Sequence, residues 1–232
     1  REPLQLLRAS RLVRTDASSE SKHDGITCLL VEMSTPGIEV RPIQNMSGTA
    51  MFAEVFFNDV RVPVENRLGA EGQGWQVTVS ALASERSSIA EVTAMFRKLE
   101  ELTELAKKTT RNGVPAAKDA RVRRQLAVFE AKIEAMRLNG LRYLTKQLRG
   151  EPLSSETSVN KLHRADLEVE MGDFALELLG SANQYVRGAD EAVDAGRWAT
   201  GALNWPEVVI GGGTPNIQKN IIAERILHLP KD

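Results

Sequence analysis

The chain has 232 residues, of which 42% are hydrophobic and 26% charged, as in an ordinary folded protein with one large or two modest domains. Its 30 basic and 31 acidic side chains give a net charge of −1, so charge gives no reason to expect nucleic acid or an anionic membrane surface as a partner. No apolar stretch approaches the roughly 20 residues that span a bilayer. The single cysteine, Cys28, cannot form an internal disulfide, which favours a buried thiol and a cytoplasmic location.

Residues 1–72 carry strand signals. The runs ITCLLVEM (26–33), PGIEVRPI (36–43) and FAEVFFNDVRVP (52–63) are short, rich in β-branched and aromatic residues, and separated by loops. They predict part of an antiparallel sheet or barrel. Because residues 1–20 supply only one more candidate strand, the sheet needs further strands from elsewhere.

From Gly74 onwards the apolar residues recur at helical spacing, which predicts long helices joined by short connections. Such helices pack most simply as an antiparallel bundle, so the predicted fold is α+β with a four-helix bundle in residues 73–232. The predicted helices cover about residues 74–108, 120–149, 154–179 and 215–229. The predicted apolar stripes of the first three are Val92, Met95, Leu99, Leu102 and Ala106; Leu126, Phe129, Ile133, Met136, Leu144 and Leu148; and Leu167, Met171, Phe174 and Leu178.

Local motifs leave the chemistry open. The histidines are far apart, and the absence of CxxC, HExxH and GxSxG leaves a metal or a serine nucleophile without support. The run Gly211–Thr214 fits either a hinge into a helix or a phosphate-binding helix start. Glu85 and Arg86, within an otherwise uncharged stretch, fit either a buried structural pair or a site. Arg111 and the basic run Arg121–Arg124 are typical of solvated surface.

Several long stretches together resemble the acyl-CoA dehydrogenase family of flavoproteins. LVRTD, KHDGITCLLVEMSTPGIEVRPIQNMSG and FAEVFFNDVRVPVENRLGAEGQGW resemble the second half of its middle β-domain and the junction into its helical domain. GGTPNIQKNIIAERILHLP resembles its terminal helix. The resemblance therefore implies that residues 1–72 are the C-terminal half of the β-domain and that residues 73–232 are the C-terminal four-helix-bundle domain.

The resemblance implies the activity and its partners. The family oxidises the α,β bond of acyl-CoA thioesters in fatty acid metabolism, using FAD and, as electron acceptor, an electron-transferring flavoprotein. Its members are homo-oligomers, dimers or tetramers, or mixed assemblies of active and inactive subunits. The N-terminal half of such an enzyme, which contacts the flavin ring and the acyl-CoA, has no counterpart here, so the chain alone is expected to be inactive.

The position of the catalytic base departs from the usual pattern. Most members carry a glutamate before Gly-Thr of the terminal motif, where this chain has Gly212. A minority, including isovaleryl-CoA and long-chain acyl-CoA dehydrogenases, carries the base before an arginine on the first long helix, and ALASERSSIA matches with Glu85 as base and Arg86 as the neighbouring arginine. The alternative is a catalytically silent subunit that relies on a partner. Gly212 either donates its N–H to the thioester oxygen or simply gives the loop room.

The resemblance also assigns flavin contacts. Arg111 matches an arginine that reaches the pyrophosphate across a subunit interface, although the Phe-Gly that usually follows it is absent. Gly180 and Ser181 match a Gly-Gly loop near the adenine, but a glutamine three residues earlier is replaced by Glu177. Thr214 and Asn216, the last matched contacts, follow Gly212 in the terminal motif.

Overall fold

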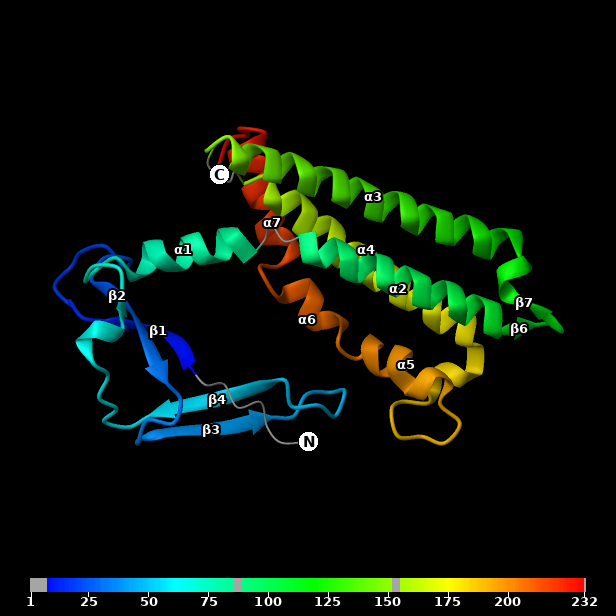
Figure 1. The fold of residues 1–232 in the computed structure, drawn as a ribbon, viewed down its shortest axis with the longest axis horizontal. Coiled ribbons are helices and arrows are strands. Elements are labelled where there is room, and N and C mark those ends of the chain that lie inside the picture. The colour runs from blue at the N-terminus through cyan, green and yellow to red at the C-terminus, as the bar shows by residue number, and fades with distance from the viewer. Residues whose placement is uncertain (1–7, 86–88, 152–154, 232) are drawn as a thin grey trace. The chain divides into compact units, whose positions relative to one another are not determined.

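The computed structural model describes residues 8–85, 89–151 and 155–231, without the side chains of residues 82–85 and 89–90 (Figure 1). The chain divides into two compact units, Arg1–Ala83 and Ser84–Asp232. The first unit holds small sheets and the second is helical, so the predicted α+β fold is confirmed.

The first unit is built from two antiparallel sheets. One has the strand order β1-β2-β5, and the other pairs β3 with β4. In the first sheet Leu12 lies opposite Cys28, and in the second Ile38 lies opposite Phe57. The strands are β1 (Arg8–Arg14), β2 (Ile26–Glu32), β3 (Ile38–Ile43), β4 (Phe52–Phe57) and β5 (Arg67–Leu68), with a 3₁₀ turn at Val64–Asn66.

Strand β2 is the buried strand of this unit. Cys28 is 3% exposed, so the predicted buried thiol is confirmed. Burial raises the pKa of this thiol, which keeps it protonated. Helix α1 (Gly74–Glu85) begins directly against β2, where a Cβ on Gly74 would lie 2.5 Å from the carbonyl carbon of Thr27. Trp75 in its first turn stacks on His23 with ring centroids 4.1 Å apart. Glycine at position 74 is therefore what lets the helix meet the sheet.

The second unit contains three long helices whose chain direction alternates, α2, α3 and α4 (Figure 1). A small hairpin of β6 and β7 joins α2 to α3, and Asp119 caps α3 by accepting from the Arg121 N–H at 2.8 Å. Shorter helices follow α4 and return along it. The helices are α2 (Ile89–Lys108), α3 (Ala120–Leu148), α4 (Thr157–Leu179), α5 (Arg197–Ala202), α6 (Trp205–Ile210) and α7 (Pro215–Ile221); the short elements are β6 (Thr110–Arg111), β7 (Val114–Pro115), 3₁₀ turns at Ala116–Lys118, Gly180–Gln184 and Val193–Gly196, and a π-helical turn at Ile222–Ile226.

The core lies between α2, α3 and α4. The predicted stripes of α2 and α4 are confirmed in full, because each of their residues is buried. On α3, Phe129, Ile133 and Met136 are buried, but Leu144 and Leu148 are 38% and 81% exposed. The buried face continues through Gly140 and Tyr143. At about 100° per residue, Leu144 and Leu148 lie roughly 100° and 140° around the helix from Tyr143, so the predicted stripe is wrong there.

Other boundaries also differ from the predictions. Residues 86–88, within the predicted first helix, and Ser154, a predicted cap, lie outside the described residues. The last helix is regular only to Ile221, since a π-helical turn follows. Helices α5 and α6 were missed, because six residues are too few to show a helical period.

Within the described ranges, no helix is both long enough and apolar enough to cross a membrane.

The buried stripe generates a matched test of the core. Leu102 is fully buried and Leu148 is 81% exposed, so the same truncation has different consequences at the two sites. We expect Leu102→Ala to lower the free energy of unfolding by roughly 2–5 kcal/mol, through lost burial and the cavity left behind. Leu148→Ala should change it by less than about 0.5 kcal/mol. Urea denaturation of both variants checks this, and equal losses would contradict the assigned core.

Candidate functional site

The glycine run forms a tight loop between α6 and α7. Gly212 and Gly213 have φ angles of +69° and +105°, a region that favours glycine. The Gly211 N–H donates to the Glu207 oxygen at 2.7 Å, and the Gly213 N–H donates to the Ile210 oxygen at 3.1 Å. Among the described residues, the Gly212 N–H between them has no hydrogen-bond partner. The Gly212 N–H is therefore available as a backbone donor, whereas the N–H groups of Gly211 and Gly213 are already hydrogen-bonded within the loop.

Thr214 closes this loop by capping α7. Its hydroxyl accepts from the Ile217 N–H at 3.4 Å, and Pro215 occupies the first turn, where a missing N–H costs nothing. Asn216, in the same turn, is exposed. Gly212, Thr214 and Asn216, three of the predicted site residues, are therefore held together in one short segment.

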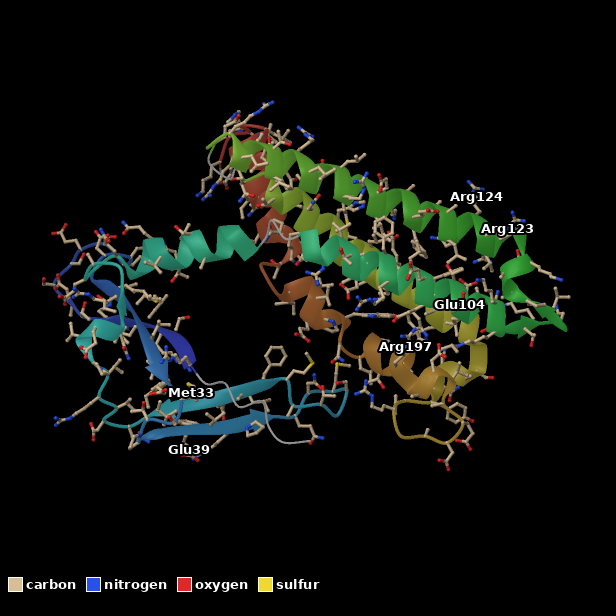
Figure 2. All side chains as sticks on the ribbon, viewed as in Figure 1. Met33, Glu39, Glu104, Arg123, Arg124 and Arg197 are labelled. Carbon is tan, nitrogen blue, oxygen red and sulfur yellow. The ribbon has the colours of Figure 1, made fainter. Side chains whose placement is uncertain are left out.

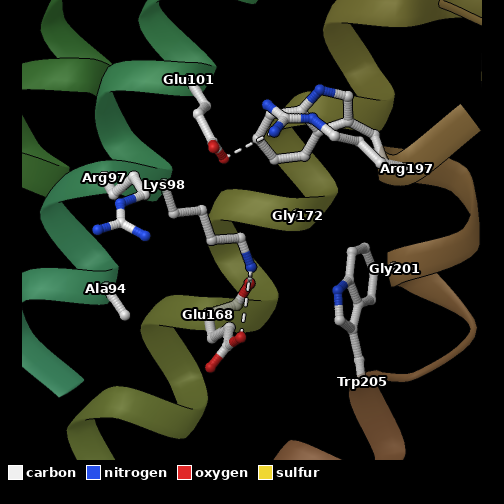
Figure 3. Close-up of a pocket in the computed structure, with 10 residues that line it drawn as sticks. Ala94, Arg97, Lys98, Glu101, Glu168, Gly172, Arg197, Gly201 and Trp205 are labelled. Atoms are coloured by element: carbon white, nitrogen blue, oxygen red, sulfur yellow. Dashed lines mark hydrogen bonds and ion pairs between the residues drawn. The ribbon is translucent and has the colours of Figure 1, made fainter. Parts of the chain in front are cut away.

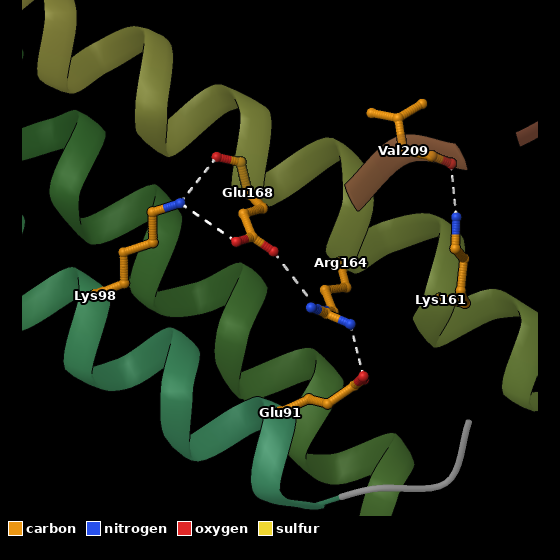
Figure 4. A network of polar contacts seen from close by, with 6 residues as sticks. All are labelled: Glu91, Lys98, Lys161, Arg164, Glu168 and Val209. Atoms are coloured by element: carbon orange, nitrogen blue, oxygen red, sulfur yellow. Dashed lines mark hydrogen bonds and ion pairs between the residues drawn. The ribbon is translucent and has the colours of Figure 1, made fainter. Parts of the chain in front are cut away.

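The Lys161 side chain lies beside Gly212. A Cβ on Gly212 would meet Cε of Lys161 at 3.6 Å, which is ordinary contact. Lys161 lies in the second turn of α4 and donates from Nζ to the Val209 oxygen at 2.8 Å (Figure 4). The last turn of α6, directly before the glycine loop, is therefore tied to α4 by a cation that lies beside Gly212.

The predicted base lies at the end of α1. Glu85 is the last residue of that helix, and its side chain is not described. Arg86 lies outside the described residues.

A second cluster lies at the other end of α4. Arg111, which is 37% exposed, donates from Nη2 to the Glu177 main-chain oxygen at 2.6 Å, and its Nη1 lies 3.8 Å from Glu177 Oε1. Arg121 places Nη2 3.2 Å from the same carboxylate oxygen. The C-terminal end of a helix attracts cations, and Glu177 adds a full negative charge there. The sequence analysis did not predict that Glu177 contacts both Arg111 and Arg121, since contacts between residues far apart in the sequence leave no periodic signal.

The loop that follows is exposed at Gly180. Gly180 has φ +56° and a Cβ there would meet nothing within 4 Å, and Ser181 continues into a 3₁₀ turn. Partly exposed Arg111 beside this open loop suits an anionic, flat group such as the phosphate and ring of a dinucleotide. Glu177 opposes such a group, because its carboxylate already neutralises Arg111.

The two clusters lie far apart within one chain. Lys161 and Glu177 are both on α4, separated by 16 residues, which at about 1.5 Å per residue is roughly 24 Å. One end of α4 therefore serves the glycine loop, and the other end serves Arg111 and Gly180.

A pocket that the sequence did not predict lies between α2, α4, α5 and α6 (Figure 3). It has a volume of about 310 Å³. Lys98 Nζ lies 3.6 Å from Glu168 Oε1, and Arg197 Nη1 lies 2.9 Å from Glu101 Oε2. Burial lowers the pKa of Lys98, while Glu168 opposes that shift by favouring the ammonium form.

Ion pairs extend from this pocket along α4. Glu168 Oε2 lies 3.6 Å from Arg164 Nε, and Arg164 Nη1 lies 2.6 Å from Glu91 Oε1 (Figure 4). Because its charges pair with one another across α2 and α4, the network joins these helices.

Comparison with known proteins agrees with this fold. Residues 72–227 match the family model described as acyl-CoA dehydrogenase, C-terminal domain. Acyl-CoA dehydrogenase IpdE1 of Mycobacterium tuberculosis (strain ATCC 25618 / H37Rv) is 34% identical over 95% of this chain and 55% of its own length. The chain therefore belongs to the acyl-CoA dehydrogenase family, which confirms the resemblance, and it spans about half the length of this curated relative.

Solved structures show the same fold. The ChsE4-ChsE5 complex from Mycobacterium tuberculosis matches with a TM-score of 0.79 and 29% identity, over 95% of this chain and 57% of the matched chain. The structure described as Tcur3481-Tcur3483 steroid ACAD matches with a TM-score of 0.80 and 26% identity, over 95% and 56%.

Two glycines of the pocket provide a matched test of its packing. A Cβ on Gly172 of α4 would lie 2.0 Å from Cζ2 of Trp205, whereas a Cβ on Gly201 of α5 would meet nothing within 4 Å. Alanine in a helix is favoured over glycine by about 0.5–1 kcal/mol, so Gly201→Ala should stabilise the protein. Gly172→Ala should instead destabilise it by roughly 1–3 kcal/mol, because Trp205 has to move. Denaturant unfolding measures both, and stabilisation by both would show that Trp205 does not pack on Gly172.

Proposed function

We propose that this chain is the C-terminal part of an FAD-dependent acyl-CoA dehydrogenase in which Glu85 is the catalytic base. The proposal rests chiefly on position 212, where a glycine with positive φ and a neighbouring lysine stand in place of the family's usual carboxylate. Glu85, directly before Arg86 at the end of α1, matches the alternative position used by a minority of the family. Residues 1–72 and 73–232 are proposed as the β-domain and bundle portions of that enzyme.

In the proposed reaction, Glu85 removes the α-proton of an acyl-CoA thioester. That proton is weakly acidic, so its removal needs a desolvated carboxylate and a donor to the thioester oxygen, which gains negative charge. The unoccupied Gly212 N–H supplies such a donor, and Arg86 orients the base. FAD, if bound, would supply the acceptor for the β-hydride.

The flavin is proposed to contact residues at both ends of α4. Arg111 pairs with the pyrophosphate, Gly180 and Ser181 lie beside the adenine, and Thr214 and Asn216 hold the segment next to the glycine loop. Lys161, beside the glycine loop, and Glu177, beside Arg111, are roughly 24 Å apart along α4. Arg111, Gly180 and Ser181 are therefore proposed to serve a flavin whose glycine loop comes from a neighbouring subunit.

Assembly and substrate are proposed by analogy with relatives. The ChsE4-ChsE5 complex supports a mixed assembly as well as a homo-oligomer, and the steroid ACAD supports a bulky acyl group. Helix α3 offers an apolar outer face for a subunit contact, since Leu138, Leu141 and Leu148 are exposed on it. An electron-transferring flavoprotein is the proposed electron acceptor.

A second candidate function is a catalytically silent subunit of such an assembly. The missing carboxylate at position 212 favours it as well, if Glu85 has only a structural role. Purified full-length protein that is colourless, yet binds acyl-CoA or a second subunit, would support this reading. Anaerobic flavin bleaching by an acyl-CoA panel, including straight, branched and polycyclic chains, would support the enzyme.

The base assignment predicts a large effect of one isosteric change. Glu85→Gln keeps shape and polarity but removes basicity, so the rate of flavin reduction in the full-length protein should fall by roughly 10²–10⁴ or more while acyl-CoA still binds. Glu104→Gln, an exposed position on α2, is the control and should leave the rate unchanged (Figure 2). Stopped-flow measurement that finds the Glu85→Gln rate near the unmodified one would place the base elsewhere.

Placing a glutamate at position 212, where most of the family has its base, should recover only part of the rate of flavin reduction. In the Glu85→Gln background, Gly212→Glu is strained by φ +69°, and nearby Lys161 would lower the pKa of the new carboxylate.

The flavin assignment predicts a contrast between two arginines. Arg111→Ala should weaken FAD retention, because it removes a cation facing the open loop at Gly180. Arg123, exposed on the outer side of α3, is the matched control, and its alanine variant should retain FAD (Figure 2). Glu177→Gln should strengthen retention, since it frees the Arg111 charge from the carboxylate. Fluorescence titration of apoprotein with FAD tests all three, and equal affinities would exclude Arg111 from the flavin site.

A further inference from the structure

The peptide between Gly212 and Gly213 is held from both of its edges. Its oxygen accepts from Gln218 Nε2 at 2.8 Å, and its N–H donates to the Ile210 oxygen at 3.1 Å. The preceding turn of α6 is fixed by Lys161, which donates to the Val209 oxygen (Figure 4). The Gly212 N–H belongs to the preceding peptide, between Gly211 and Gly212. That peptide is held at both ends, because the Gly211 N–H donates to the Glu207 oxygen and the Gly212 oxygen accepts from Gln218.

Gln218 makes its contact from a fully buried position. The residue is 0% exposed in α7. Its backbone N–H donates to the Thr214 oxygen at 3.0 Å, so it lies one helical turn after the glycine loop. A Cβ on Gly213 would lie 2.5 Å from Nε2, so only glycine lets the amide approach this closely. The Gln218 side chain and the Gly213 backbone therefore form one fitted contact.

The environment of the Gln218 Oε1 atom indicates why a glutamine is present at this position. Among the described residues, buried Gln218 Oε1 has no hydrogen-bond partner. Turning the amide over would face Oε1 against the Gly212 oxygen, so the orientation is fixed by repulsion between acceptors. Burying an unpaired acceptor is unfavourable, and an apolar side chain of similar size would avoid it. The position thus keeps an amide at a cost to stability, and the bond to Gly212 is what that amide provides.

We propose that Gln218 is a positioning residue: by holding the Gly212 carbonyl oxygen it fixes the backbone at Gly212, so that the N–H of the same residue can donate to the thioester oxygen of the substrate. The proposal rests on the function proposed above. Hydrogen-bond donors that stabilise developing charge act best when they are fixed beforehand, because reorientation during the reaction is then unnecessary. Gln218 supplies that fixation without touching the substrate.

The test compares two CoA ligands that differ only at the carbonyl. One is the thioester that best bleaches the flavin, and the other is its thioether analogue, in which CH₂ replaces C=O and no oxygen is left to accept. Affinities are measured in the full-length Glu85→Gln protein, where turnover is slow. Gln218→Met, nearly equal in size, should lower the preference for thioester over thioether by roughly 10-fold or more while thioether affinity stays unchanged. Gln147→Met, on the exposed side of α3, is the matched control.

A second variant disrupts the hydrogen bond between Gln218 and the Gly212 oxygen by a change in the loop. Gly213→Ala leaves Gln218 in place but pushes Nε2 away, and it should cause a similar loss of preference. If a variant folds, judged by circular dichroism and FAD retention, and its preference is unchanged, the proposal is overturned. If neither variant folds, Gln218 has a structural role and the proposal fails too. If no thioester reduces the flavin of the unmodified protein, the proposed function itself fails, a result that is independent of Gln218.

Discussion

The helical unit depends on the burial of α4 on several sides. Helices α2, α3, α5, α6 and α7 all pack against it, and Leu167, Met171 and Ala175 in its middle are fully buried. A helix in this position has no wide polar face to present to solvent. Both candidate clusters nevertheless use polar residues of α4, Lys161 near its beginning and Glu177 near its end. One rigid helix therefore sets the distance between the glycine loop and the cluster around Arg111.

Buried polar contacts fix how α3 lies along α4. Asn160 donates to the Met136 oxygen at 3.2 Å and accepts from Asn139 at 3.2 Å, while the Tyr143 hydroxyl donates to the Glu156 oxygen at 2.7 Å. Burial raises the pKa of Tyr143, which keeps this donor protonated. Apolar packing alone tolerates sliding, whereas directional bonds to buried backbone do not. Because Asn160 directly precedes Lys161, the same bonds position the lysine that supports the glycine loop.

The sequence predicted the parts of the fold that repeat. The stripe Leu167, Met171, Phe174 and Leu178 could be recognised because burial on a helix follows its period, and the strands could be recognised by their composition. The prediction that Leu148 is buried was wrong, because an apolar residue at helical spacing can also face outwards. The candidate site was predicted differently, through long motifs that resemble a family. The contacts of Gln218 and Glu177 could not be predicted, since they depend on how distant segments pack.

The glycine at position 212 removes a carboxylate side chain from the loop, but it leaves a backbone N–H that the loop can still offer to a ligand. A positive φ, a lysine beside the missing side chain and a peptide held at both edges are mutually consistent features of a loop that acts through its backbone. A glutamate there would be strained and would pair with Lys161, which would reduce its basicity. A loop of this kind is compatible with a base only if the base comes from another element, and Glu85 at the end of α1 is the residue that the family pattern offers. Under the proposed function, a glycine at position 212 and a base at Glu85 go together, since the first leaves the loop without a carboxylate and the second supplies one.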